Sequence, residues 1–292
     1  MSQGPTFLKR HVGEELKKLR VAAGKSRKDA ADKLDCSLSK ITKIERGYNA
    51  VKRAELDDLL TLYNADAEIA ESLLRIASES KQRGWWSSYG QAVPDWFRTF
   101  VGLEYAAEEI QKYTEIIPGL LQVEPYTRAA IAAVSPDLSE VEVENRLKVR
   151  AERQARLLGM DPPRLNFVLG EAAIQRLVGG PKVMLQQLQF LLDIQQTKPV
   201  EIRILDNDAG AHAALGFTFT LLRHPDELDA GTVYVEGLTR ADYFDQRTDP
   251  LDVDLYRLAF ARVRDAALSV QKSRDLLARV VVDLQERAKG GT

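Results

Sequence analysis

Hydrophobic positions between residues 26 and 47 recur with the period of two short helices that meet at a tight corner. The positions expected to face inward are Ala30, Ala31 and Leu34 in the first helix and Ile41 and Ile44 in the second. Ser26 and Ser37 stand where the two helices begin, and serine is a good N-cap. Gly47 stands where the second helix is expected to end, as a C′ glycine. The pattern therefore predicts a helix-turn-helix.

The outward face of the second predicted helix carries short hydrogen-bonding side chains and cations. Such side chains suit the base edges and phosphates of a DNA major groove. The residues expected to contact bases are Leu38, Ser39, Thr42 and Lys43. The residues expected to contact phosphates are Arg27, Lys28, Lys40, Arg46, Lys52 and Arg53. Double-stranded DNA is therefore the first partner that the sequence indicates.

Three further amphipathic segments complete the predicted N-terminal domain. A helix over residues 12–22 is expected to place Leu16 and Leu19 inward and to stop at Gly24. The inward positions of the two helices after residue 53 are Leu56, Leu59, Leu60 and Tyr63, and then Ile69, Leu73, Leu74 and Ile76. Five short helices around one core are expected, in a domain that spans residues 1–80.

Residues 81–99 contain all three tryptophans of the chain, Trp85, Trp86 and Trp96. Flanking glycines and a proline interrupt the helical periodicity, so the segment is expected to be a connector. Its aromatic side chains have two interpretations: they pack on the second domain, or they form a lid over a pocket. Any signal that passes between the two domains would travel through this connector or through a dimer interface.

From residue 100 to residue 292, strand and helix patterns alternate. They predict an α+β domain with a mixed or largely antiparallel sheet flanked by helices. The predicted strands are residues 110–115, 164–169, 200–205, 217–222, 232–236 and 240–244. The predicted helices are residues 124–134, 139–158, 171–178, 182–196, 250–266 and 269–287. The last helix has an apolar stripe that is expected to dock on its own domain rather than on a second subunit.

The charge of the chain is divided unequally. Residues 1–53 contain 14 Lys and Arg but six Asp and Glu, a formal charge of +8, whereas the whole chain has −2. A basic N-terminal domain on an acidic body is typical of a protein that contacts DNA with one end. The single cysteine, Cys36, excludes an internal disulfide, and no apolar run approaches the length of a membrane span. We therefore expect a cytoplasmic protein without a membrane partner.

Few residues of the chain indicate catalysis. The three histidines, His11, His212 and His224, are not spaced as metal ligands from one another or from Cys36. The sequence has neither a Gly-x-Ser-x-Gly motif nor a phosphate loop with Gly-Lys-Ser/Thr. We therefore expect no enzyme activity, no metal site and no cofactor.

A ligand or signal site has several candidates in the second predicted domain. The turn at residues 206–212 is rich in oxygen atoms, but Phe217 stands where a calcium loop has an acidic residue. The arginines of the helix over residues 139–158 form either a solvated ion-pair face or a site for an anion or partner. The residues expected to take part in ligand binding or signalling are Trp85, Trp86, Trp96, Tyr126, Arg150, Arg153, His212 and Glu236.

Residues 41–47 read Ile-Thr-Lys-Ile-Glu-Arg-Gly and follow the pattern Ile-x-x-Ile-Glu-x-Gly. By this motif the N-terminal segment resembles the xenobiotic-response-element, or lambda-repressor-like, family of DNA-binding domains. The sequence departs from the family at Arg27, which stands where a phosphate-contacting Gln is common, so that the role persists in cationic form. Leu38 replaces a polar base-reading position, which implies apolar contact with a thymine methyl. Near Val51, the customary proline is replaced.

Seven ordered segments carry a second resemblance, residues 84–86, 103–106, 117–122, 150–154, 180–184, 208–212 and 234–236. Together they resemble the C-terminal domain of WhiJ-like, antitoxin-like regulators of actinobacteria. The resemblance implies transcriptional control of development or secondary metabolism, a small partner protein encoded nearby, and a sensory C-terminal domain. It implies no catalytic residue.

These features predict a homodimeric, sequence-specific DNA-binding regulator of transcription. Its C-terminal domain is expected to provide dimerisation and to sense a small-molecule effector or a partner protein. One alternative is an antitoxin-type protein whose acidic body neutralises a small partner and for which DNA binding is secondary. A second alternative is an enzyme fused to a DNA-binding module, with Glu171, Glu236 or His212 in its site.

Overall fold

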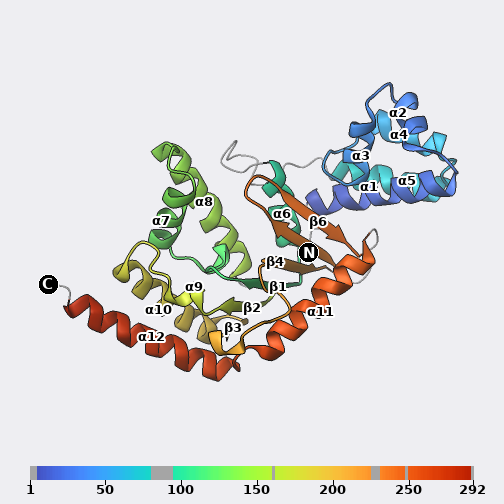
Figure 1. Ribbon diagram of the computed structural model, residues 1–292. Coiled ribbons are helices and arrows are strands. Elements are labelled where there is room, and N and C mark those ends of the chain that lie inside the picture. The colour runs from blue at the N-terminus through green and yellow to red at the C-terminus, as the bar shows by residue number, and fades with distance from the viewer. Residues whose placement is uncertain (1–4, 80–94, 160–161, 225–230, 247–248, 291–292) are drawn as a thin grey trace. The chain divides into compact units, whose positions relative to one another are not determined.

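A computed structural model of the chain describes residues 5–79, 95–159, 162–224, 231–246 and 249–290. These residues form two units, the first up to α5 together with residues 97–106, and the second from residue 107 onward (Figure 1). The helices up to residue 106 are α1 (Pro5–Ala22), α2 (Arg27–Lys33), α3 (Leu38–Glu45), α4 (Arg53–Leu62), α5 (Ala67–Glu79) and α6 (Asp95–Ala106).

Five helices of the first unit, α1 to α5, surround one hydrophobic core, as the periodicity predicted. The buried core includes Val12, Leu16, Ala30, Ala31, Ile41, Ile44, Leu56, Leu59, Leu60, Tyr63 and Leu73. The small residues on α2 allow it to pack closely against its neighbours. The isoleucines of α3 fill the rest of the core. Each of the two helices of the predicted helix-turn-helix therefore buries the face that the sequence assigned to it.

Two expectations for the first unit were wrong. Helix α1 begins at Pro5 rather than at Val12, because proline is tolerated in a first helical turn and Leu8 extends the buried stripe one turn. Helix α6 occupies part of the segment expected to be an irregular connector. On it the rings of Phe97 and Phe100 are stacked, with their centroids 5.4 Å apart. Trp85, Trp86 and the side chain of Trp96 lie outside the described residues.

The second unit has a six-stranded mixed sheet flanked by helices, as expected. Its strands are β1 (Glu109–Thr114), β2 (Arg164–Gly170), β3 (Val200–Leu205), β4 (Phe219–Arg223), β5 (Thr232–Glu236) and β6 (Ala241–Asp245). The strand order is β3-β2-β1-β4-β5-β6. Strands β1, β2 and β3 run parallel, and the pairs β1–β4, β4–β5 and β5–β6 are antiparallel. The fourth strand begins two residues later than predicted.

The helices of the second unit are α7 (Glu124–Val134), α8 (Glu140–Leu157), α9 (Ala172–Gln175), α10 (Pro181–Thr197), α11 (Pro250–Ala266) and α12 (Val270–Gly290). Two 3-10 turns, η2 (Gly119–Leu121) and η3 (Asn207–Ala209), lie between them. Helix α9 is shorter than the predicted helix over residues 171–178. The chain becomes extended at Arg176, and the positive φ angles of Gly179 and Gly180 then redirect it into α10.

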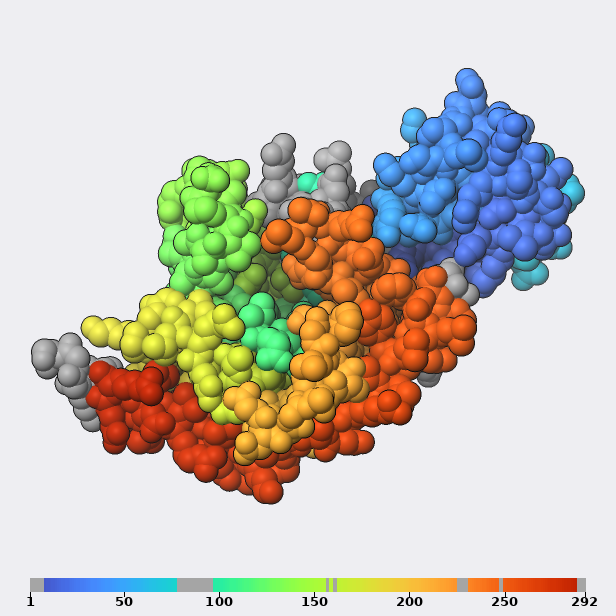
Figure 2. All heavy atoms as spheres, viewed as in Figure 1, coloured from blue at the N-terminus to red at the C-terminus, as the bar shows by residue number. Residues whose placement is uncertain are grey.

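Helices α11 and α12 cover different parts of the sheet and lie along one side of this unit (Figures 1 and 2). Val253, Phe260 and Val263 of α11 share a buried cluster with Tyr113 and Phe219 of the sheet. Helix α12 packs on α10 and β3, and its residues Leu277, Val281 and Leu284 are buried. The prediction that the last helix docks on its own domain is therefore confirmed.

Candidate nucleic-acid interface

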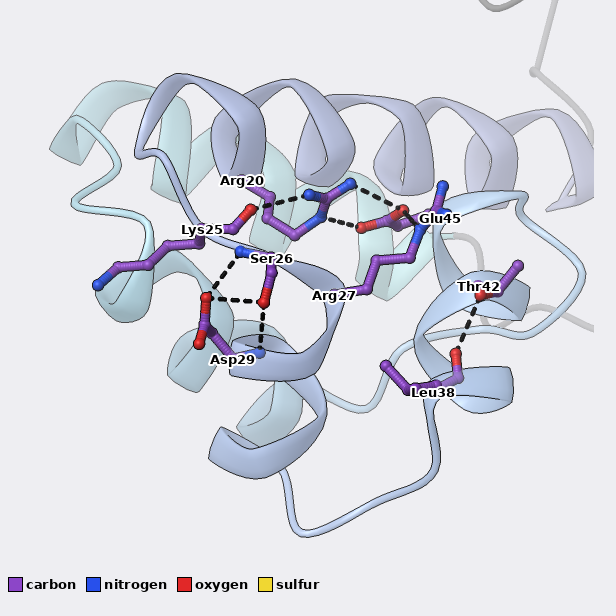
Figure 3. Close-up of polar contacts among 8 residues, drawn as sticks. All are labelled: Arg20, Lys25, Ser26, Arg27, Asp29, Leu38, Thr42 and Glu45. Carbon is purple, nitrogen blue, oxygen red and sulfur yellow. Dashed lines mark hydrogen bonds and ion pairs between the residues drawn. The ribbon is translucent and has the colours of Figure 1, made fainter.

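Ser26 fixes the start of α2 through a reciprocal pair of hydrogen bonds with Asp29 (Figure 3). The Asp29 amide donates to Ser26 Oγ at 3.1 Å, and the Ser26 amide donates to Asp29 Oδ2 at 2.7 Å. These bonds satisfy donors that a helix end leaves open. Hydrogen bonds from the Ser26 backbone and side chain hold the pKa of the Asp29 carboxyl below its ordinary value.

Close backbone contacts fix the position of α3. Asp35 turns the corner with a φ of +46°, and Ser37 Oγ accepts from the Lys40 amide at 3.2 Å. Gly47 ends the helix with a φ of +68°, and an added Cβ there would lie 2.5 Å from Arg10 Cα. A Cβ on Gly13 of α1 would lie 2.2 Å from the Ile44 carbonyl oxygen. Helices α1 and α3 therefore touch at glycines, which holds α3 rigidly.

The four residues expected to read bases lie on α3 as the sequence predicted, but not all are equally exposed. Leu38 is 53% exposed, and Ser39 and Lys43 are also exposed. Thr42 is half-buried, and its hydroxyl donates to the Leu38 carbonyl oxygen at 3.0 Å (Figure 3). Since that bond occupies its hydrogen, the Thr42 hydroxyl is left to act as an acceptor.

Five cations on and beside α3 have no carboxylate within ion-pair distance among residues 5–79. They are Lys28, Lys43, Arg46, Lys52 and Arg53, and all five are exposed. Lys40 differs, because its Nζ lies 2.8 Å from Glu55 Oε1. The hydrogen bond to Glu55 raises the pKa of Lys40 above its ordinary value. Lys40 remains charged, but a carboxylate already balances that charge.

The remaining phosphate candidate, Arg27, belongs to a group of three ions around the buried Glu45 that the sequence did not predict. Glu45, whose side chain is 3% exposed, receives Arg20 Nε at 2.5 Å on one oxygen and Arg27 Nε at 2.8 Å on the other (Figure 3). Arg20 also donates to the Lys25 carbonyl oxygen. Arg27 is 44% exposed, so its two Nη groups remain available to an anion. Burial and the Glu45 charge raise the pKa of nearby Tyr63 to about 12.

The exposed cations of the first unit thus lie on α3 and on the segments next to it in the chain, together with the short polar side chains of α3. Arg53 stands at the N-terminus of α4, where the helix dipole adds to the positive potential. Exposed cations without an ion pair favour an anionic partner, and a polyanion with regularly spaced phosphates can contact several at once. The arrangement suits a DNA backbone, with α3 positioned to enter a groove.

Among the candidates in the second unit, the structure brings two pairs together. Arg150 of α8 donates to Gln122 Oε1, and its charge acts on buried Tyr126. Arg153, also buried, lowers the pKa of Tyr234, although burial and nearby Glu236 act more strongly and raise it. His212 lies apart from both pairs, with Nε2 3.2 Å from the Tyr113 hydroxyl. The Tyr113 hydroxyl donates to Glu115.

Family comparisons match both units. Residues 11–73 match the model of a helix-turn-helix domain, and residues 97–279 match that of a domain of unknown function, DUF5753. The chain belongs to the DUF5753 family. No curated protein and no solved structure matches it.

In this DUF5753 protein, the helix-turn-helix match covers α2, α3, α4 and the segments between them, which carry the five cations. The helix-turn-helix domain supports a role for the chain in DNA binding and in regulation of transcription. None of the described helices is both long and apolar enough to cross a bilayer.

Proposed function

We propose that this DUF5753 protein is a homodimeric, sequence-specific regulator of transcription that binds operator DNA through α3. Leu38, Ser39, Thr42 and Lys43 read base edges, and the surrounding cations bind phosphates. The observation that carries the proposal is the set of five exposed cations without a carboxylate partner around α3. Charges of this kind favour an anionic partner, whereas paired charges do not.

The direct test is binding of the full chain to a labelled pool of duplex DNA, measured by fluorescence anisotropy over a range of salt concentrations. Reversing two charges, with Lys43→Glu and Arg46→Glu together, is expected to weaken binding at least tenfold and to flatten the salt dependence. Arg75→Glu is the matched control, because Arg75 is exposed on α5 of the same unit. Equal losses in the double variant and the control would contradict the proposal.

Dimerisation is supported by an exposed apolar row on α11. Leu251, Leu255 and Leu258 are 79%, 64% and 47% exposed and lie on the face opposite the buried one. In an antiparallel pair of α11 helices centred on Leu258, Asp254 of one copy lies opposite Arg262 of the other, and Leu255 lies opposite Ala261. Sedimentation of Leu255→Glu is expected to give a monomer. An unchanged dimer would place the interface elsewhere.

The second unit modulates DNA binding through a small-molecule effector or a small neighbour-encoded protein. The resemblance to WhiJ-like regulators supports this assignment, and so does the match of the second unit to a family model separate from the helix-turn-helix. A pull-down from the native source separates the two signals. A stoichiometric small protein that remains bound without effector would instead favour the antitoxin-type function.

A further inference from the structure

A hollow of about 380 Å³ lies between α11 and the amino-terminal part of β1, with β4 beside it. Its lining contains none of the residues predicted from the sequence to bind a ligand or carry a signal. Its volume is within the range of small-molecule sites. Leu221 and Phe260 supply apolar surface, and Arg223, Arg257 and Arg264 line it with three guanidinium groups.

The carboxylate on the sheet side of the hollow is already fully engaged. Glu109 Oε2 receives Arg223 Nε at 3.1 Å and Arg164 Nη2 at 3.2 Å. Its other oxygen accepts from Asn166 at 2.8 Å and from Gln111 at 3.1 Å. Burial opposes ionisation of Glu109, but these hydrogen bonds and the two arginine charges outweigh it and lower its pKa. Glu109 therefore has little capacity left to balance the arginines of α11.

The arginines of α11 are less compensated. The Nη1 of Arg257 lies 3.5 Å from Asp254 Oδ1, in a pair whose two side chains are exposed. Within the described ranges Arg264 forms no ion pair. Gly231 lets Arg257 approach the backbone, because an added Cβ there would lie 2.5 Å from Arg257 Nη2. Exposed Asp265 is the second carboxylate of the lining.

We propose that this hollow binds a small organic anion with an apolar body, whose anionic group is held by Arg257 and Arg264. The apolar part lies against Leu221 and Phe260. Two guanidinium groups on one helix form charge-assisted hydrogen bonds to a carboxylate, sulfonate or phosphate group, and the apolar floor favours a ring or chain over a bare inorganic ion. Use of this site by an effector rests on the proposed function, but anion binding itself does not.

The test is a fluorescence titration of the full chain with 8-anilinonaphthalene-1-sulfonate, an apolar organic anion. We expect saturable binding that is at least tenfold weaker in the variant with both Arg257→Ala and Arg264→Ala. Arg279→Ala, on the exposed face of α12, is the matched control and is expected to leave binding unchanged. In the Leu255→Glu background, where the proposed α11 contact is absent, Ala261→Trp at an exposed lining position fills the hollow without altering a buried residue and is expected to weaken binding similarly.

Charge is tested separately from shape. Asp265→Asn is expected to tighten binding of the dye, and the uncharged analogue N-phenyl-1-naphthylamine is expected to bind equally to the wild type and to the double arginine variant. Unchanged dye affinity in both the double variant and Ala261→Trp would overturn the proposal. So would an equal loss in Arg279→Ala.

DNA binding by the same proteins distinguishes this proposal from the proposed function. Without dye, the double arginine variant is expected to bind DNA like the wild type. If the dye binds at the hollow but does not change DNA affinity, the anion site stands and its effector role is rejected. If neither the wild type nor the variants bind DNA while dye binding follows the expected pattern, the proposed function fails and the anion site stands.

Discussion

Cations of the two units differ in what surrounds them. In the second unit, Arg128 of α7 contacts Glu124, Glu140 and Glu144, and Arg164 and Arg223 share Glu109. In the first unit, five cations around α3 have no such partner within residues 5–79. Residues of the same types therefore join elements together at these paired sites of the second unit and remain available to a partner around α3 and, in the second unit, at Arg257 and Arg264. Pairing, rather than the count of charges, separates the two roles.

The first unit contains its own exception to this contrast. Buried Glu45 holds buried Arg20 and the partly exposed Arg27, and Glu55 holds Lys40 of α3. Paired cations lie beside unpaired ones on a single small domain. Substitutions that break or create pairs can therefore test the comparison within one fold.

The largest expected effect follows removal of the buried carboxylate. Glu45→Gln leaves the Arg20 guanidinium buried without a counter-charge, and we expect the first unit to lose about 3 kcal/mol of stability. Glu140→Gln breaks an exposed pair of the second unit and is expected to cost much less, because water screens exposed pairs. Hydrogen exchange on peptides from each unit measures both losses. Equal losses would mean that burial does not distinguish the two kinds of pair.

The next effect concerns an unpaired cation. Arg53→Ala is expected to remove one phosphate contact and to reduce the slope of log affinity against log salt by about 0.9, whatever the DNA sequence. Arg128→Ala, which removes a paired cation of the second unit, is expected to leave that slope unchanged. Anisotropy titrations at several salt concentrations measure both slopes. A salt slope that changes in Arg128→Ala but not in Arg53→Ala would contradict this contrast between paired and unpaired cations.

A smaller effect is expected from releasing a paired cation. Glu55→Gln removes the carboxylate that balances Lys40 and lowers the negative charge beside α3. We expect DNA binding to tighten by no more than about 1 kcal/mol, since the pair that is broken is partly exposed. Asp57→Asn, an exposed change on the same helix, controls for net charge. Identical gains in both variants would show that pairing with Lys40 has no role.

The smallest effects are expected from the two capping boxes. Hydrogen bonds from Ser26 lower the pKa of Asp29 in the first unit, and hydrogen bonds from Ser139 lower the pKa of Glu142 in the second. A lowered folded-state pKa stabilises the fold above the unfolded pKa, near 4, and this contribution is lost as the pH falls through the folded value. Asp29→Asn and Glu142→Gln should each remove part of the acid dependence. Acid titrations followed by circular dichroism that match the wild type would contradict this.

Local features were predictable from the sequence, and contacts between distant segments were not. Ser26, Ser37 and Gly47 act within a few residues of their place in the chain, so capping and turn chemistry identified α2 and α3. The group formed by Arg20, Arg27 and Glu45 depends on how three helices cross, which no local pattern encodes. The glutamate of the Ile-x-x-Ile-Glu-x-Gly motif was the one available signal, because a carboxylate at a buried helical position requires a partner.

The second unit shows the same limit. Alternating hydrophobic positions identified all six strands, but their order depends on pairings between residues more than 100 positions apart, such as Lys112 with Thr220. The hollow beside α11 arises from this order and was not predicted. Helix α6 was missed because neighbouring glycine and proline residues suggested irregular structure.

Reading of DNA sequence by α3 is tested most directly by selection from a library of randomised duplexes. We predict that the full chain enriches one motif and that Lys43→Ala changes the preference at one base pair, worth about 1–3 kcal/mol, while Arg75→Ala leaves the motif intact. Failure of the full chain to enrich any sequence, or the same motif from Lys43→Ala and the wild type, would contradict it.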